Sequence, residues 1–119
     1  MKSTAMQEIH LKGWGSEKWI VNNESYCGKI LHFMQGKKCS WHFHKLKRET
    51  FFIQSGKLQV YFSYGDEIAS ADHVILYPGD SFEVPQGLRH QMVALEETFL
   101  IEFSTQHFEE DSYRLEKGD

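Results

Sequence analysis

Short apolar or aromatic runs, each ended by turn-forming residues, recur along this sequence and constrain its fold more than any other feature. The runs are Lys18–Val21, Gly28–Met34, Ser40–His44, Thr50–Ile53, Lys57–Tyr64, His73–Tyr77, Ser81–Val84, Arg89–Leu95 and Thr98–Phe103. Asn-Asn, Ser-Gly, Gly-Asp and Pro-Gly steps separate many of them, and such residues favour tight turns. Eight or nine short strands at this spacing predict an all-β sandwich or barrel.

Alternation of side chains supports the strand prediction. Leu58, Val60 and Phe62 share one face of a predicted strand, and polar or aromatic residues occupy the other. The apolar residues that we expect to form the barrel core or the pocket wall are Phe51, Ile53, Val60, Phe62, Met92, Phe99 and Ile101. The polar, acidic segment from Gln106 to Asp119 is expected to form a short turn or irregular segment laid across the barrel.

Composition sets the size and class of the protein. With 119 residues, 40% of them hydrophobic and 14% aromatic, the chain is expected to form a single domain, residues 1–119, around one core. A net charge of −4 argues against a nucleic-acid partner, which would require a basic face. The basic run Lys45–Arg48 is short and is followed by Glu49, so we interpret it as a solvated loop.

The N-terminus contains no apolar run long enough for a signal peptide or a membrane helix. We therefore expect a cytoplasmic protein with no membrane partner, in a compartment that keeps thiols reduced. Cys27 and Cys39 show no zinc-type pairing, so two unpaired thiols are expected, and a disulfide would need suitable geometry and an oxidising compartment.

Three histidines and one glutamate form a candidate metal site. His42 and His44 lie two positions apart on a predicted strand, so their side chains share a face. Glu49 opens the next strand, and His90 follows the Pro85–Gly87 turn. If the sheet closes into a barrel, all four can reach one cavity. Three imidazoles and a carboxylate suit Zn, Mn, Fe, Ni or Co. A His-x-His pair alone is a weak signal, because two exposed or two core histidines would give the same spacing.

The spacing around these four residues resembles the two motifs of the cupin superfamily. The first motif reads Gly36-KKCSW-His42-Phe43-His44-KLKR-Glu49-TFFIQS-Gly56, and the second reads Gly79-DSFEV-Pro85-Gln86-Gly87-LR-His90-QMV-Ala94. Ala94 replaces the asparagine that usually ends the second motif. The resemblance implies a double-stranded β-helix, or jelly-roll barrel, that is often dimeric. It also implies that His42, His44, Glu49 and His90 bind a divalent metal ion, so we expect a homodimer with one such site per chain.

Both ends of the chain are similar to a narrower group, the sugar-phosphate cupins such as the cupin-type phosphomannose isomerase domains. The similar segments are Gly13–Trp19, Tyr26–Lys29 and Glu109–Glu116. Two features differ: the gap between His44 and Glu49 is longer than in those domains, and Ser40 stands where they often have Gln. The resemblance implies a small-molecule substrate, a sugar or sugar phosphate.

The leading hypothesis is therefore a metal-dependent isomerase that interconverts an aldose and a ketose. The ion would polarise the carbonyl and stabilise enediolate charge, while Glu49 or another group beside the metal would move the proton. Lys29 would pair with a phosphate or a developing oxyanion if it points inward, and would otherwise be a surface lysine on an edge strand. Arg89 and Arg114 are further phosphate candidates.

Several alternatives stay open at this point. Tyr61 and Tyr64 could reach the mouth of the cavity, although the alternation assigns Tyr61 to the outward face. The same four ligands could serve an oxygenase or a lyase that acts on a small acid, which a largely apolar pocket without a phosphate-binding cation would favour. They could also belong to a non-catalytic carbohydrate-binding module, which would have a closed coordination sphere.

Overall fold

The computed structural model describes residues 8–119 as strands joined by short turns. The strands are β1 (Glu8–Lys12), β2 (Gly15–Asn22), β3 (Cys27–Phe33), β4 (Trp41–Phe43), β5 (Glu49–Ser55), β6 (Leu58–Ser63), β7 (Asp72–Leu76), β8 (Ser81–Val84), β9 (Arg89–Ala94), β10 (Thr98–Ser104) and β11 (Tyr113–Glu116). Two 3₁₀ turns complete the described elements, η1 (Ile68–Ser70) and η2 (Glu109–Asp111).

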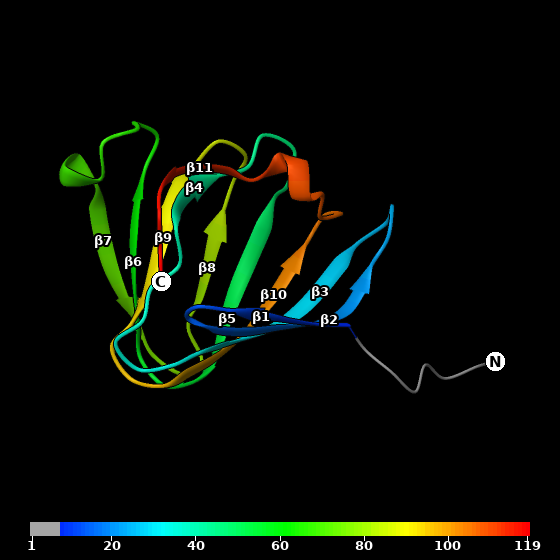
Figure 1. Ribbon diagram of the computed structural model, residues 1–119, viewed down its shortest axis with the longest axis horizontal. Helices are drawn as coiled ribbons and strands as arrows, with labels where there is room; N and C mark the ends of the chain where they lie inside the picture. Colours follow the sequence, from blue (N-terminus) through cyan, green and yellow to red (C-terminus); the bar gives the residue numbers. More distant parts are fainter. Residues whose placement is uncertain (1–7) are drawn as a thin grey trace.

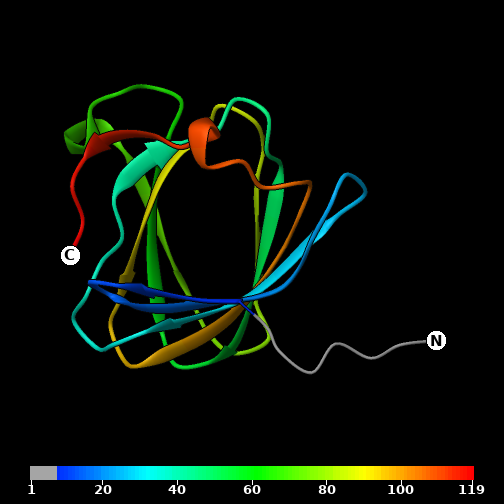
Figure 2. The same cartoon turned by 45° about the vertical axis from the view of Figure 1, so that its right-hand side comes forward.

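Two antiparallel sheets face each other. One sheet has the order β1-β2-β3-β10-β5-β8, and the other has the order β11-β4-β9-β6-β7 (Figure 1). The chain passes repeatedly from one sheet to the other, so β10 pairs with both β3 and β5, which lie far from it in the sequence. Figure 2 shows the two sheets curving around a common interior. The predicted all-β jelly-roll barrel is confirmed.

The nine predicted runs correspond to β2 through β10. β1 was not predicted: its sequence, EIHLK, alternates polar and apolar residues, but the strand is short, lies at the edge of its sheet and leaves Ile9 and Leu11 exposed. The prediction of an irregular C-terminal segment is wrong in part: η2 is a turn, but Tyr113–Glu116 forms β11, which pairs with β4. The pairing between Arg114 and His42 brings this segment beside the candidate metal site.

The core lies between the two sheets. Its buried side chains include Leu31, Phe33, Phe51, Ile53, Leu58, Val60, Val84, Met92 and Leu100, with Phe62 packed against them. Phe99 and Ile101 were also predicted to form barrel core or pocket wall, and this is wrong, since they belong to neither. Phe99 is 39% exposed and Ile101 is half-buried, because the inward positions of β10 are Thr98, Leu100 and Glu102.

Cys27 and Cys39 are buried free thiols, as expected. Burial raises the pKa of the Cys39 thiol to about 12, so it remains protonated and packs as a small apolar side chain. Across residues 8–119, no helix has the length and apolar character needed to cross a membrane.

Candidate metal centre

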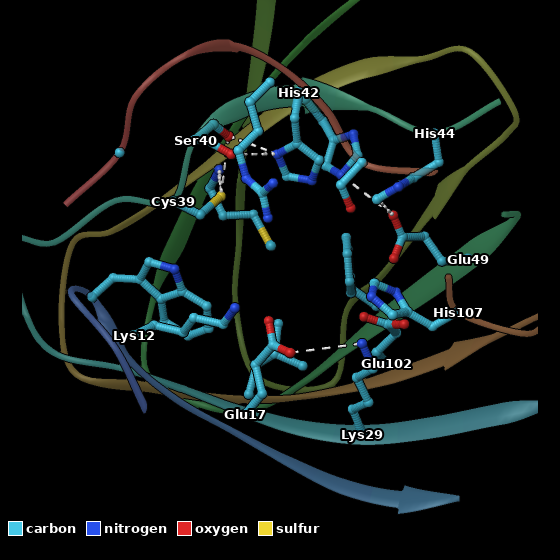
Figure 3. A pocket seen from close by; sticks show the side chains of 18 of the residues that line it. Lys12, Glu17, Lys29, Cys39, Ser40, His42, His44, Glu49, Glu102 and His107 are labelled. Carbon is cyan, nitrogen blue, oxygen red and sulfur yellow. Dashed lines mark hydrogen bonds and ion pairs between the residues drawn. The ribbon is translucent and has the colours of Figure 1, made fainter. Parts of the chain in front are cut away.

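The imidazoles of His42, His44 and His90 gather at one end of the barrel. His42 lies on β4, His44 follows β4 directly, and His90 lies on β9 opposite His42. Because side chains alternate along a strand, His42 and His44 face the same side, toward the interior (Figure 3). One ligand nitrogen from each of the three lies within 4.8 Å of the others. The three histidines are therefore placed so that they could bind one metal ion.

Glu49 approaches this triad from the opposite sheet, where it begins β5. Its Oε2 lies 3.4 Å from His44 Nε2 and 3.3 Å from His90 Nε2. The carboxylate is almost fully buried, as are both of these imidazoles. We call His42, His44, Glu49 and His90 the candidate metal centre, and these are the four residues that the sequence motifs indicated.

Hydrogen bonds to backbone carbonyls orient all three imidazoles. The acceptors are Ser40 O for His42 at 2.8 Å, Leu88 O for His90 at 3.0 Å and Asp111 O for His44 at 3.0 Å. Because a carbonyl oxygen can only accept, each Nδ1 carries the proton and each Nε2 keeps its lone pair. This is the arrangement that metal-binding histidines usually show.

Two lone pairs face each other in this centre with no donor between them. Glu49 Oε2 and His90 Nε2 are buried and have no hydrogen-bond partner among the described residues. Since His90 donates from Nδ1, neither of these two atoms can donate to the other across the 3.3 Å gap. Buried polar atoms without partners are unfavourable in folded proteins. A divalent ion fits this position, because it would accept both lone pairs, and the nitrogen and oxygen donors suit several transition metals.

Local charges and burial keep these groups in the forms that bind metal. Burial, together with the neighbouring His90 and His44, holds the pKa of His42 well below its usual range. Burial likewise lowers the pKa of His44 to about 4, against the opposing effect of Glu49. For Glu49, burial alone would raise the pKa, but the neighbouring Lys47 ammonium opposes this, and the pKa lies well below its usual value. Near neutral pH, His42 and His44 are neutral and Glu49 is ionised.

Lys47 lies behind Glu49, where the sequence did not predict it. The interpretation of Lys45–Arg48 as a solvated loop is wrong at this position, because Lys47 is only 3% exposed. Its Nζ lies 3.3 Å from Glu49 Oε1, 3.1 Å from Glu102 Oε2 and 3.0 Å from His107 Nδ1. Burial would lower the pKa of Lys47, but Glu49 and Glu102 outweigh it and raise that pKa. Lys47 is therefore a buried ammonium group whose three donors face three acceptors.

A pocket of about 310 Å³ adjoins the candidate metal centre. Lys29 on β3 is almost fully buried and lines this pocket, so the inward alternative for Lys29 is correct. Its Nζ lies 3.6 Å from Glu17 Oε1 and 4.1 Å from the centre of the Trp19 ring. In Figure 3, Glu17 and Lys29 lie across the pocket from His42 and His44.

Glu102 and His107 also line the pocket, and the sequence analysis singled out neither. Burial raises the pKa of Glu102 despite the nearby Lys47 ammonium. Burial and Lys47 lower the pKa of His107 to about 4. We refer to Glu17, Lys29, Lys47, Glu102 and His107 as the charged wall. No sequence signal pointed to Glu102, because the predicted phase of its strand placed Phe99 and Ile101 inward, whereas Leu100 and Glu102 face the interior.

The remaining predicted residues lie at varying distances from the pocket. Arg114 is exposed but lines the pocket, together with Lys12 and Lys117. Arg89 does not line it; it forms an ion pair with Asp66 at 2.8 Å. Tyr61 and Tyr64 do not line the pocket either, which agrees with the outward assignment of Tyr61.

Comparison with solved structures supports the same fold. CapF from Staphylococcus aureus, described as a capsular polysaccharide assembling protein, has a TM-score of 0.83 and 18% identity, and the match covers 95% of this chain and 33% of that one. KdgF from Halomonas sp. has a TM-score of 0.73 and 18% identity, covering 88% of this chain and 89% of that one. A variant of oxalate decarboxylase from Bacillus subtilis has a TM-score of 0.78 and 19% identity, covering 92% of this chain and 30% of that one.

The chain therefore spans about a third of the length of CapF and of oxalate decarboxylase. No relative with a significant match was found among curated protein sequences. In a comparison with protein families, residues 29–103 match the cupin domain, and this match covers the three histidines and Glu49. Together with the barrel and its two motifs, this match establishes that the chain belongs to the cupin family.

Proposed function

We propose that His42, His44, Glu49 and His90 hold a divalent metal ion and that the chain is a metal-dependent isomerase of a sugar or sugar phosphate. One observation carries the proposal: three imidazole Nε2 atoms and an unpartnered carboxylate oxygen converge at the end of a pocket whose other side is the charged wall. When bound, the ion would supply Lewis acidity toward a carbonyl or hydroxyl oxygen of the substrate.

The charged wall favours a polyhydroxylated substrate. Lys29 is paired with Glu17, and Lys47 is paired with Glu102, so ammonium and carboxylate groups stand next to each other around the pocket. A sugar hydroxyl both donates and accepts hydrogen bonds and therefore matches such pairs. In this proposal Lys29 donates to a substrate oxygen and Glu17 accepts from a neighbouring hydroxyl.

Moving a proton between two adjacent carbons requires a base that is free to accept it. Glu49 is one candidate, but the Lys47 ammonium holds its pKa low, and both of its oxygens face other site residues. Glu102 has a raised pKa and lies on the pocket wall, so it is better suited to take up the proton and return it. We therefore assign the proton transfer to Glu102 and the metal-ligand role to Glu49.

The alternatives make different demands on the pocket. An oxygenase or a lyase for a small acid would be favoured by a largely apolar pocket, whereas the wall here carries two lysines and several carboxylates. A binding module would have a closed coordination sphere, whereas the pocket here reaches His42, His44 and His90. The expected homodimer stays a prediction.

The first experiment measures metal content and sugar turnover in the same preparation. The wild-type protein is expected to hold close to one divalent ion per chain, and His42→Ala and His90→Ala should lose it while keeping the far-UV circular dichroism of a β-barrel. His73→Ala is the matched control, because His73 is exposed on β7. Wild-type affinity in both site variants would contradict the ligand assignment.

The metal-loaded protein is then incubated in D₂O with a panel of free and phosphorylated aldoses and ketoses. Proton NMR is expected to show interconversion of one aldose–ketose pair, with loss of the proton signal at C2. Glu102→Gln should abolish this exchange and still bind metal. Metal binding without any exchange would contradict the isomerase and favour the oxygenase, lyase or binding alternatives.

A further inference from the structure

We propose that Asp111 is a positioning residue for the candidate metal centre: it keeps His44 in the metal-binding tautomer and fixes the loop between His44 and Glu49. The inference rests on the proposed metal site, but the contacts that carry it do not involve the metal. Asp111 belongs to η2, in the C-terminal segment, and is 2% exposed.

The Asp111 carboxylate binds three consecutive backbone N–H groups of the loop. Oδ1 accepts from Lys45 N at 2.9 Å and from Leu46 N at 3.1 Å. Oδ2 accepts from Leu46 N at 3.2 Å and from Lys47 N at 2.9 Å. Hydrogen bonds between an ionised carboxylate and backbone N–H groups are stronger than neutral ones. A buried carboxylate held in this way fixes the loop backbone as a unit.

The Asp111 backbone carbonyl accepts the Nδ1 hydrogen bond of His44, and His44 differs in this from the other two histidines. His42 and His90 each donate to a carbonyl two residues earlier in the chain, so their own strands orient them. The acceptor for His44 lies 67 residues away in the sequence. Only for His44, among the three, does the C-terminal segment determine which nitrogen faces the centre.

The loop held by Asp111 leads directly to Glu49. Lys47, whose backbone N–H binds Asp111 Oδ2, also directs its ammonium to Glu49 Oε1. One residue thus restrains His44 on one side of the loop and Lys47, and through it Glu49, on the other. Figure 2 shows the η2 turn, in orange, at the end of the barrel where β4 and β11 meet. Such supporting contacts typically change metal affinity about 10- to 100-fold when they are removed.

Asp111→Asn and Asp111→Ala test the proposal against Glu110→Gln. Glu110 lies next to Asp111 in η2 but is exposed, so its variant removes the same charge from the same turn without touching the loop. Zinc titration against a chelating competitor is expected to show a Kd raised about 10- to 100-fold in Asp111→Asn, more in Asp111→Ala, and unchanged in Glu110→Gln. If Asp111→Ala does not fold, Asp111→Asn, which keeps the size of the side chain, decides the question.

A second measurement uses the metal-free protein. Asp111→Asn and Asp111→Ala keep the backbone carbonyl that faces His44 but lose the carboxylate contacts that hold this turn against the loop. Nitrogen-15 NMR of the histidine rings is therefore expected to show His44 with its proton on Nδ1 in the wild type and a mixture of tautomers in the Asp111 variants, with His90 unchanged. Amide hydrogen exchange at Lys45, Leu46 and Lys47 should become faster in the same variants.

Unchanged His44 tautomer and unchanged amide exchange in Asp111→Asn would overturn the positioning role. Wild-type zinc affinity in that variant would do so as well. A wild-type protein that binds no zinc, yet shows the Asp111-dependent tautomer and exchange, would contradict the proposed function and leave the positioning role standing. The two proposals can therefore fail separately.

Discussion

Lys47 is the residue on which the charge balance of the site depends. A buried ammonium group is unfavourable unless each of its donors finds a partner, and the donors of Lys47 meet Glu49, Glu102 and His107. The carboxylates of Glu49 and Glu102 depend on Lys47 in turn, because they are themselves buried and need a cation beside them. Lys47 also places Glu49: by holding Oε1, it leaves Oε2 directed at His44 and His90.

Replacing Lys47 with Met should therefore destabilise the metal-free protein strongly. The variant leaves Glu49 and Glu102 buried without their cation, and breaking a buried ion pair in this way costs about 3–5 kcal/mol. Urea unfolding monitored by tryptophan fluorescence measures the change. Lys45→Met is the control, because Lys45 is exposed, and its effect should stay within about 0.5 kcal/mol.

The double variant with Met at position 47 and Gln at position 102 separates charge from packing. Glu102→Gln removes one of the two uncompensated carboxylates, so it should restore part of the stability lost in Lys47→Met. A Lys47→Met protein as stable as the wild type would show that the ammonium is not needed to balance the buried carboxylates.

At the residue scale, the sequence predicts the candidate metal ligands better than it predicts the buried charged residues that hold them in place. The His42–His44 pair follows from local spacing, because two positions on a strand share a face, whereas the assignment of Glu49 and His90 beside it rests on the resemblance to the two cupin motifs. Lys47 was assigned to solvent because lysines are rarely buried, and its partners Glu102 and His107 lie more than fifty residues away. No local pattern reports such a pairing.

At the scale of the elements, Gly56 ends β5 and allows the tight turn into β6. Its φ angle is +96°, in the region that favours glycine, and a Cβ atom there would lie 2.2 Å from Glu97 O. Gly36 has a φ angle of +81°, but a Cβ atom at Gly36 would meet nothing within 4 Å. The two glycines bound the first cupin motif, yet only Gly56 is also restricted by its surroundings.

Gly56→Ala is therefore expected to lower the free energy of unfolding more than Gly36→Ala. The Gly36 variant has only the backbone penalty of a left-handed conformation, about 1–2 kcal/mol, whereas the Gly56 variant must also displace the backbone at Glu97 and Thr98. Chemical denaturation of both variants under the same conditions measures the difference. Equal losses would mean that the turn moves freely to accept a methyl group.

The elements themselves were largely predictable, and the errors have a physical origin. Turn residues located β2 through β10. On β10 the phase of the alternation was assigned wrongly, because Phe99, Ile101 and Phe103 form an apolar outer row while the inward row includes Glu102. A shift of one residue exchanges the two faces of a strand, so a polar inward residue misleads a reading based on hydrophobicity alone. β11 alternates Tyr113 and Leu115 with Arg114 and Glu116, but it is only four residues long and exposed along its length, so its alternation is too short to indicate a strand.

At the scale of the whole molecule, ionisable groups from both sheets meet inside the barrel. Glu17, Lys29 and Glu102 come from one sheet, while His42 and His90 come from the other. Folding therefore transfers several titratable groups into an environment that changes their protonation, and stability must depend on pH. The dependence can be examined at His107, which hydrogen-bonds with Lys47 and with none of the four candidate ligands, and whose ring meets that of His44 edge-on with the centroids 6.4 Å apart.

The metal-free protein is expected to lose stability between about pH 6.5 and pH 4, in part because of His107. The unfolded chain protonates this histidine near its ordinary pKa of about 6.5, whereas burial and Lys47 lower the pKa to about 4 in the folded protein. Below pH 6.5 the unfolded state thus binds more protons, and falling pH favours it. Partial exposure to solvent keeps the contribution below about 1.4 kcal/mol per pH unit.

His107→Gln removes this contribution, so its free energy of unfolding should fall less steeply over the same pH range than that of the wild type. Gln can still accept from the Lys47 ammonium, which keeps the contact while abolishing the titration. Urea unfolding at intervals from pH 7.5 to pH 4.5 measures both slopes, with His73→Gln as the control because His73 is exposed. The control should follow the wild type. Parallel curves for His107→Gln and the wild type would show that His107 has the same proton affinity in the folded and the unfolded protein, and hence that its position beside Lys47 does not disfavour the charged imidazole.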